Sequence, residues 1–301
     1  MDTLSELETK ARILIIGASG RLGTQLVKEL DENSDGVIVR LSTSDPQRAQ
    51  QWKDEGREAA VLDLDKPGTF EEALKDVDRV FLLTGYTVDM LKQSKMLVDA
   101  ASDMGVKHIV HLGVFTSRRD IIPHFIWRDM IEAYIEASGI AWTHLHPNVI
   151  SDTTLVLDPP ISETGSFSVF WGEGSQGWVF ASDIAAVAAE VLRSGPKKHA
   201  GADYYLSTEV LTGPEVAQIL SEASGKNIAC NLYGPEEQKA FAEKIESVSV
   251  RSYMESATIT MELAQSGRME FQNVVRDDVM KVLGRPGLTM EAWARQNLKY
   301  P

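Results

Sequence analysis

The feature that most constrains this chain is the alternation of short apolar runs with longer amphipathic stretches over its first half. The apolar runs have the composition of strands and cover residues 12–16, 36–41, 59–64, 79–83, 108–113 and 140–145. Helical patterns lie between them, over residues 22–30, 46–55, 69–77, 87–105 and 123–139. Apolar strands joined by crossover helices are typical of a parallel sheet covered on both faces, with right-handed connections. We therefore predict an α/β fold built on a doubly wound (Rossmann) parallel sheet.

This regularity ends after the sixth apolar run. Residues 158–167 and 171–178 are rich in Gly, Ser and Pro, so we expect loops in both stretches. A helical pattern returns over residues 182–195, where Ser182 is the expected N-cap and Gly195 the expected end. We expect this helix to pack on the sheet.

The remainder of the chain is mostly helical in pattern. One more strand is expected over residues 204–207, and a helix over 212–225 has Pro214 in its first turn. Further helices are expected from about residue 230, the last over 289–298. We expect two units: a Rossmann domain and a smaller, mostly helical C-terminal lobe. Residues 1–150 form the first, with 178–207 returning to its sheet, and residues 151–177 and 208–301 form the second.

Composition excludes several classes of protein. The net charge of −14 disfavours nucleic acids and anionic membranes as partners. The single cysteine, Cys230, excludes an internal disulfide and argues against a thiolate metal cage. The start, "MDTLSELETKAR", lacks the pattern of a secretory leader, and no apolar stretch is long enough to span a membrane. We expect a cytoplasmic protein.

The most informative motif is "IIGASGRLG", residues 15–23, in which Gly17, Gly20 and Gly23 follow the first strand and precede the first helix. In this context the backbone N–H groups and the dipole at the helix start favour a bound diphosphate. The spacing is G-x-x-G-x-x-G, in place of the tighter G-x-G-x-x-G. The alternative is a glycine turn that only lets helix and strand pack closely. The strand–helix units that follow favour nucleotide binding.

Several segments in this order resemble the NmrA-like branch of the atypical short-chain dehydrogenases. That branch includes type-2 quinone oxidoreductases and triphenylmethane reductases and, more distantly, isoflavone and pinoresinol-lariciresinol reductases. The segments are "GASGRLG" (17–23), "DPQRAQQW" (45–52), "VLDLDKPGTFEEALKDVDRVFLLTG" (61–85), "GVKHIVHLG" (105–113), "SGIAWTHLHPN" (138–148), "GWVFASDIAAVAAEVL" (177–192) and "LTGPEVAQILSEASGK" (211–226). Each segment is weak alone, but their order and spacing together are specific. The resemblance implies an NAD(P)-binding domain followed by a substrate-binding lobe.

The resemblance also implies where a dinucleotide would lie. Its diphosphate would contact the glycine turn, its adenine would lie near the third strand, and its ribose and nicotinamide would lie after the fourth. The implied residues are Gly17, Ser19, Gly20, Arg21 and Leu22 for the diphosphate, Asp63 and Leu64 for adenine, and Leu83, Thr84 and Gly85 for the nicotinamide side.

The end of the second strand bears on the choice between NAD and NADP. An acid at this point grips the ribose 2′-OH of NAD and repels a 2′-phosphate. The stretch here, "VRLSTSDPQR", has the hydroxyls of Ser42 and Ser44 and the cation of Arg48, with Asp45 shortly after the strand end. We favour NADP(H), with NAD(H) also open. For Arg48, a solvated helix face is the alternative to phosphate contact.

The expected catalytic residues depart from the common pattern. Short-chain dehydrogenases that reduce carbonyls pair Tyr with Lys at i and i+4 on a helix, whereas "HFIWR" places His124 and Arg128 there. His124 is a candidate proton donor, Arg128 can stabilise a developing oxyanion, and Glu132 matches an acid found in several of the reductases. The alternatives are that His124 is an ordinary residue at a helix start and that Arg128 pairs with Glu132 or Asp129 on the surface.

Leu112 stands where the family often has Ser or Thr, so the hydroxyl that polarises a carbonyl is absent. Thr116 or Ser117 could replace that hydroxyl from the following loop, although nothing in the sequence requires it. Ordinary alcohol or ketone chemistry is therefore disfavoured. Hydride transfer to an acceptor that needs little proton help, such as a quinone, an azo compound or a cationic dye, remains open.

Aromatic and polar residues near the strand ends are candidates for a pocket wall, while Trp178 is expected to serve packing. The candidates are Phe115, Trp127, Asn148, Trp171 and Tyr233. His144 and His146, like His108 and His111, share a strand, but no third metal ligand lies nearby in the chain. We expect packing and no metal.

Two classes of function stay open. The first is an NAD(P)H-dependent reductase of a conjugated small molecule, acting as a monomer or homodimer. The second is a non-catalytic NAD(P)-sensing regulator that acts through a protein partner, as some NmrA-like proteins do. The absent Tyr and Ser favour the regulator. The Gly/Pro-rich segment 158–178 and the C-terminal lobe favour the enzyme, which we prefer.

Overall fold

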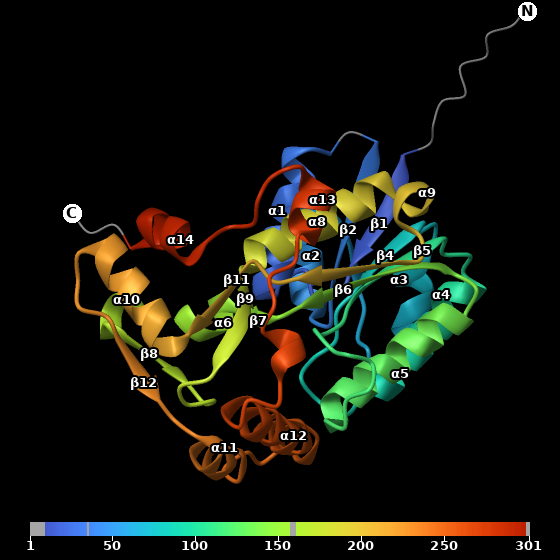
Figure 1. Cartoon of the computed structure of the whole chain (residues 1–301). Coiled ribbons are helices and arrows are strands. Elements are labelled where there is room, and N and C mark those ends of the chain that lie inside the picture. The colour runs from blue at the N-terminus through green and yellow to red at the C-terminus, as the bar shows by residue number, and fades with distance from the viewer. Residues whose placement is uncertain (1–9, 35, 157–160, 299–301) are drawn as a thin grey trace, which may run out of the picture.

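The first strand, β1 (Ala11–Ile15), lies inside a parallel sheet, with β2 (Val37–Thr43) on one side and β4 (Arg79–Leu82) on the other. The computed structural model describes residues 10–34, 36–156 and 161–298. The sheet is completed by β3 (Glu58–Val61), β5 (His108–Leu112), β6 (Ala141–Pro147) and β10 (Ala202–Leu206). Its order is β10-β6-β5-β4-β1-β2-β3, and every pairing is parallel (Figure 1). The predicted doubly wound fold is confirmed, and the strand order reverses between β1 and β4.

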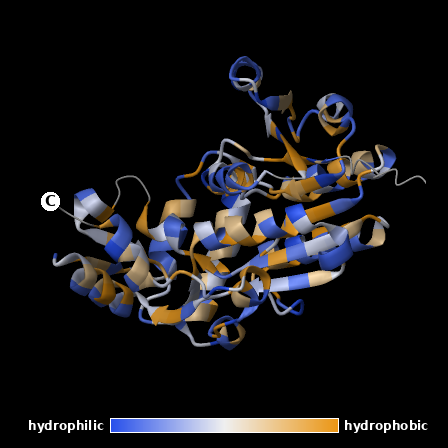
Figure 2. Ribbon diagram, turned by 90° about the horizontal axis from the view of Figure 1, so that it is seen from above, coloured by the Kyte–Doolittle hydropathy of each residue, from blue (hydrophilic) through white to orange (hydrophobic). Residues whose placement is uncertain are grey.

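Helices cover both faces of this sheet. They are α1 (Arg21–Glu32), α2 (Pro46–Asp54), α3 (Phe70–Leu74, after a 3-10 turn at Pro67–Thr69), α4 (Met90–Asp103), α5 (Pro123–Ala137), α8 (Ala181–Ser194) and the short α9 (Pro196–His199). Successive residues of β1 serve different cores: Ile13 and Ile15 pack with α1 and α8, whereas Leu14 packs with α3, α4 and α5. This two-sided burial explains why the strands are apolar throughout. The helices are banded blue and orange in Figure 2, as expected for amphipathic helices.

A third core lies beyond the sheet, at the left and bottom of Figure 1. It contains a three-stranded sheet, β11-β9-β7, and a two-stranded sheet, β12-β8. The strands are β7 (Val149–Ile150), β8 (Ser166–Val169), β9 (Ser175–Val179), β11 (Glu209–Thr212) and β12 (Ala229–Leu232). The helices of this part are α6 (Ser151–Leu155), α7 (Ile161–Thr164), α10 (Gly213–Ser224), α11 (Pro235–Ala242), α12 (Val248–Gln265) and α14 (Met290–Asn297), with a 3-10 turn at Glu270–Gln272. In the chain, α13 (Asp278–Leu283) lies between this 3-10 turn and α14, and it packs on α8.

Two expected loops are in part strands. Residues 166–169 form β8 and residues 175–179 form β9, although residues 166–167 and 175–178 were expected to lie in loops; residues 158–160 lie outside the described part of the chain. The strand β9 is stabilised by antiparallel pairing with β11, in which Trp178 faces Glu209. Such a partner, about thirty residues away, leaves no local signal in a Gly- and Ser-rich run.

The ends of α8 and α10 show which capping predictions hold. The N-cap of α8 is Phe180, not Ser182, and the Asp152 carboxylate accepts a hydrogen bond from the Ala181 N–H at 2.8 Å. A distant carboxylate thus replaces the local cap that we expected. Gly195 ends α8 with φ +71°, and Pro214 lies in the first turn of α10, both as predicted. In the described part of the chain, no helix is long and apolar enough to cross a membrane.

Candidate active site

The glycine turn between β1 and α1 is shaped by close backbone contact. Gly17 adopts φ +74°, in the left-handed region that favours glycine. A Cβ on Gly23 would lie 2.0 Å from the Gly17 carbonyl oxygen, so only glycine lets α1 approach the turn this closely. Gly20 is the N-cap of α1, and no side chain caps the helix. The turn therefore serves close packing and also leaves the helix N-terminus open to an anionic ligand.

A cavity of about 320 Å³ lies along the carboxyl ends of β1, β2, β3 and β4. It gathers most of the residues that we expected to bind a dinucleotide, since its lining includes Gly17, Ser19, Ser42, Ser44, Asp63, Leu64, Leu83 and Gly85. Gly20, Arg21, Leu22 and Thr84 do not line it. The first three begin α1, directly after Ser19, and the hydroxyl of Thr84 is buried without a hydrogen-bond partner. The cavity thus runs across the point at which the strand order reverses, where ligands of such sheets bind.

The acids near this cavity are engaged elsewhere. Asp45 caps α2 by accepting a hydrogen bond from the Gln47 N–H at 2.9 Å. Asp63 pairs with Lys66 at 2.8 Å, and the hydrogen bond from Lys66 lowers the pKa of Asp63. Arg48 lines an adjoining cavity that shares Ser19 with the first, and it lies over the ring of Trp52. This arrangement leaves hydroxyls and a guanidinium, rather than a free carboxylate, near the end of β2.

A second cavity, of about 290 Å³, adjoins the first, and Leu83 lines both. Its lining includes four residues that the sequence pointed to: His124, Arg128, Asn148 and Trp171. Leu112 also lines it, so an apolar side chain stands where a carbonyl-polarising hydroxyl was sought. Tyr86, Tyr253 and Met261 line it too, and our sequence analysis missed them. Tyr253 and Met261 lie on α12, which packs against α5, and burial raises the pKa of Tyr253 to about 12.

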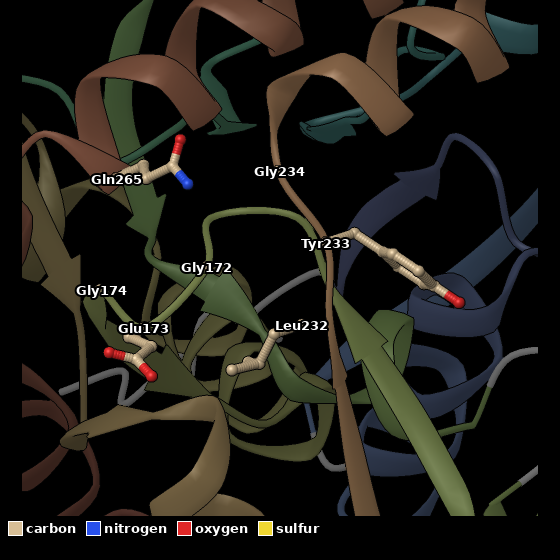
Figure 3. A pocket seen from close by; sticks show the side chains of 7 residues that line it. All are labelled: Gly172, Glu173, Gly174, Leu232, Tyr233, Gly234 and Gln265. Carbon is tan, nitrogen blue, oxygen red and sulfur yellow. The ribbon is translucent and has the colours of Figure 1, made fainter.

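The predicted positions of three aromatic residues in the wall of this second cavity need correction. Phe115 is buried and packs edge-on against Tyr205, with ring centroids 5.2 Å apart. Trp127 packs with the helices on the α4 side of the sheet. Tyr233 is 40% exposed and lines a separate surface cavity with Gly172–Gly174 and Gln265 (Figure 3). The backbone carbonyl of Tyr233 instead accepts a hydrogen bond from the Gly172 N–H, next to Trp171. Trp178 is fully buried, as expected.

Arg128 is buried at the floor of the second cavity. It is 3% exposed, and its Nη1 donates a hydrogen bond to the Leu112 carbonyl at 2.9 Å. Within the described ranges no carboxylate forms an ion pair with it, so the alternative of a surface pair with Glu132 or Asp129 is wrong. A buried guanidinium without a counter-charge favours an anion or a developing negative charge nearby.

His124 lies one turn before Arg128, but it cannot serve as the expected acid near neutral pH. Burial, and then the charge of Arg128, lower the pKa of His124 to about 3. The ring and backbone N–H of His124 both lie within hydrogen-bond distance of the Ser256 hydroxyl, at 2.8 and 2.9 Å. The imidazole is therefore neutral at pH 7 and ties α5 to α12.

Glu132 also needs correction as a catalytic candidate. It does not line the second cavity, and it is fully buried between α5 and the sheet. Its carboxylate accepts a hydrogen bond from Arg118 at 3.2 Å. Burial raises the pKa of Glu132 to about 7. Its neighbours there are the histidines of β5 and β6.

The doubly wound sheet, the glycine turn and the groove across the reversal of strand order define a nucleotide-binding α/β protein. The model of the NmrA-like family matches residues 9–273, and the chain belongs to this family. The NAD(P)H azoreductase of Xenophilus azovorans is 30% identical over 285 residues, which are 94% of this chain and 96% of that protein.

Solved structures of similar fold include two reductases. Triphenylmethane reductase of Citrobacter sp., solved with NADP(H), is 25% identical with a TM-score of 0.77 over 95% of this chain and 99% of that one. The quinone oxidoreductase QOR2 of Escherichia coli, solved with NADPH, has the same fold at 22% identity, with a TM-score of 0.77 over 94% of this chain and 99% of that one.

Proposed function

We propose that this NAD(P)H-dependent oxidoreductase of the NmrA-like family transfers a hydride to a conjugated small molecule, such as an azo compound, a quinone or a dye-like aromatic. The observation that carries this proposal is that the two cavities adjoin at Leu83, which lines both. A dinucleotide along the first cavity, with its diphosphate at the glycine turn, reaches the second at the end of β4. The azo and triphenylmethane substrates in the names of two relatives fit an acceptor of this kind.

The first cavity is proposed to bind NADP(H), with NAD(H) accepted less well. When bound, the reduced nicotinamide supplies the hydride. Ser42 and Ser44 line the cavity at the end of β2, Asp45 is engaged in capping α2, and Arg48 lines the adjoining cavity together with Ser19. A 2′-phosphate would therefore meet hydroxyls and a cation, since the Asp45 carboxylate does not line the cavity.

The second cavity is proposed to hold the acceptor. Its walls are largely apolar and aromatic, from Leu112, Trp171, Tyr253 and Met261, and they exclude water from a flat acceptor. Arg128 supplies the one buried cation in that lining, and it would stabilise the negative charge that develops on an azo compound or a quinone during hydride transfer. The remaining rate enhancement would come from holding donor and acceptor in contact.

The two units that we expect in the chain agree with this assignment of one cavity to the cofactor and the other to the acceptor. Residues 1–150 with 178–207 form the proposed cofactor domain, and residues 151–177 with 208–301 form the proposed substrate lobe. Trp171 and Tyr253, from the lobe, line the second cavity together with His124 and Arg128 of α5. The acceptor would thus lie between the two units, where ligand sites often occur.

The direct test mixes the purified protein with NADPH or NADH and a panel of quinones, azo compounds and triphenylmethane dyes, and follows the absorbance of the reduced nicotinamide. We expect acceptor-dependent oxidation. Arg128→Ala should lower kcat by about 10- to 100-fold with a smaller change in the Kd of NADPH. Equal losses in both quantities would assign Arg128 to cofactor binding and contradict its proposed role.

Arg79 provides a matched control. It is partly buried and, like Arg128, donates to backbone carbonyls, those of Leu192 and Arg193, but it lies at the opposite end of β4. Arg79→Lys should leave kcat unchanged. An equal loss of kcat in this variant would show that the Arg128 effect is structural.

The second candidate is a non-catalytic sensor of NAD(P) that acts through a protein partner. The apolar Leu112 and the neutral His124 favour it, because the cavity offers little acid catalysis near pH 7. Tight NADPH binding without oxidation across the whole acceptor panel would support the sensor over the enzyme.

A further inference from the structure

Three side chains that can bind metal ions meet beneath the floor of the second cavity. His111 comes from β5, Glu132 from α5 and His144 from β6. One ligand atom from each lies within 4.8 Å of the other two, and all three side chains are fully buried. The expectation of packing alone depended on the lack of a third ligand nearby in the chain, and the fold brings that ligand from a different element.

The polar atoms of this cluster lack hydrogen-bond partners. Both ring nitrogens of His111, both of His144 and Oε1 of Glu132 are buried without one within the described ranges. Each such atom costs free energy unless it is satisfied, and five in one place form an unusual concentration. An ion that accepts nitrogen and oxygen donors would satisfy several of them at once.

The surroundings hold the three side chains in place. Trp142 stacks on His144 with ring centroids 4.5 Å apart, and the rings of His111 and His144 meet edge-on at 5.5 Å. Arg118 donates to Oε2 of Glu132, which leaves Oε1 for the cluster. Outer hydrogen bonds of this kind orient the carboxylates that bind metals.

His146 is excluded as a ligand because both of its nitrogens are engaged. Nδ1 lies 3.0 Å from the Val114 carbonyl, and Nε2 lies 2.8 Å from the Asp203 carboxylate. Glu136 is close by, but its Oε1 already pairs with Arg118 at 3.1 Å, so water is the better fourth donor. Oε1 of Glu136 lies 3.5 Å from Nε2 of His144, and the Glu136 side chain is 31% exposed, so it also marks a route from solvent.

We propose that His111, Glu132 and His144 form a binding site for one divalent transition-metal ion of the Zn²⁺ type, with water as the fourth ligand. Two imidazoles and a carboxylate suit Zn²⁺, Co²⁺, Ni²⁺ and Cu²⁺ better than Mg²⁺ or Ca²⁺, which prefer oxygen. The nearby cation of Arg118 is balanced by its ion pairs with Glu136 and Asp203. The donor atoms, which lie up to 4.8 Å apart, must approach one another to about 3.3–3.6 Å, the separation of tetrahedral donors whose bonds to zinc are about 2.0–2.2 Å long.

An ion at this site would fasten α5 to the sheet under the active site. Glu132 lies one turn after Arg128 on α5, and His111 immediately precedes Leu112, whose carbonyl accepts from Arg128. Gly113, which lines the second cavity, is so close that a Cβ there would lie 2.3 Å from Oε1 of Glu132. The proposed ion is therefore structural and fixes the position of Arg128.

The test uses the full chain after treatment with a chelator. Zn²⁺ is titrated by calorimetry, and Co²⁺ is followed through its visible absorption. We expect saturation at one ion per chain, a Co²⁺ spectrum typical of a four-coordinate site, and no competition by excess Mg²⁺. No retained Zn²⁺ after dialysis, or a six-coordinate Co²⁺ spectrum, would overturn the proposal.

Variants separate this site from adventitious binding. Glu132→Gln and His144→Gln should each weaken Zn²⁺ binding by at least about 10-fold, as expected for the loss of a ligand. His108→Gln is the matched control, since His108 is equally buried on β5 but bonds to Thr143. Equal weakening in all three variants would contradict the site.

A thermal measurement on the unaltered chain keeps the proposal testable if a variant does not fold. Zn²⁺ should raise Tm and the chelator should reverse the rise, with no dinucleotide present. No change in Tm on adding Zn²⁺ would count against the site. This result does not depend on turnover, so it stands apart from the proposed reductase function.

Discussion

Replacing Gly23 by alanine tests the close contact that shapes the glycine turn. The new Cβ would lie 2.0 Å from the carbonyl oxygen of Gly17, 2.8 Å from its carbonyl carbon and 2.9 Å from Cα of Ala18. All three are backbone atoms, so no side-chain rotation can relieve the overlap. The start of α1 must move away from the turn.

The cost can be bounded from general values. Overpacking costs about 1–3 kcal/mol, and the higher helix propensity of alanine returns at most about 1 kcal/mol. We expect a net loss of about 1–2 kcal/mol and a Tm lower by about 2–6 °C. NADPH binding should weaken as well, because the displaced N–H groups of α1 are the proposed diphosphate site.

Two other glycines serve as references. At Gly68 a Cβ would meet nothing within 4 Å, so Gly68→Ala should leave both Tm and NADPH affinity unchanged. At Gly20 the nearest atom would be the Gly17 carbonyl oxygen at 3.2 Å, a milder contact placed at the helix N-terminus. Gly20→Ala should therefore weaken NADPH binding with a smaller fall in Tm than Gly23→Ala.

The assay combines thermal unfolding with NADPH titration for the three variants. If Gly23→Ala unfolds at the temperature of the parent protein and binds NADPH equally well, the close-contact argument is refuted.

Two further predictions concern charge. The pKa of His124 is lowered to about 3 in the folded chain, whereas a histidine in the unfolded chain titrates near about 6.5. As the pH falls below about 6.5, the unfolded chain therefore gains a proton that the folded chain does not, and the free energy of unfolding decreases. His124→Asn should make that fall between pH 7 and 5 smaller, by up to about 1.4 kcal/mol per pH unit, in urea unfolding; parallel curves for the two proteins would contradict the buried neutral ring. Arg48→Ala should raise the Kd of NADPH by up to about 5-fold and leave that of NADH unchanged, since the exposed guanidinium is proposed to contact the 2′-phosphate that NADH lacks. Equal weakening of both would favour the solvated helix face that we considered as the alternative.

The sheet could be predicted because its signals are local. Each strand is a short apolar run, and β1 shows why: Ile13 and Leu14 point into different cores, so both faces must be apolar. The glycine turn could likewise be predicted, because Gly17 and Gly23 are only six residues apart in the chain and their backbones are in close contact. Propensity and chain-local geometry determine both features.

The second cavity could be predicted only in part. His124 and Arg128 share one face of α5, so their spacing revealed them. Tyr253 reaches the same cavity only because α12 docks on α5, and the local sequence of α12 carries no trace of that contact. The prediction that Tyr233 lines the second cavity was wrong for the converse reason, since the pairing of β12 with β8 places Tyr233 at another surface.

The buried cluster of His111, Glu132 and His144 could not be predicted from the sequence for the same reason. His111 and His144 lie in register on adjacent strands, and Glu132 enters from the helix between them. In the chain they are separated by 21 and 12 residues, so no ligand spacing marks them. Only the parallel register and the packing of α5 bring them together.

The central claim is that the start of α1, with no side chain to cap it, receives the diphosphate of a pyridine dinucleotide. Isothermal titration calorimetry of the purified chain with NADPH, NADP⁺, NADH and NAD⁺ tests it most directly. The account predicts saturable binding at one molecule per chain, strongest for the NADP forms and weaker in Gly20→Ala. No heat or saturation with any of the four dinucleotides would contradict it.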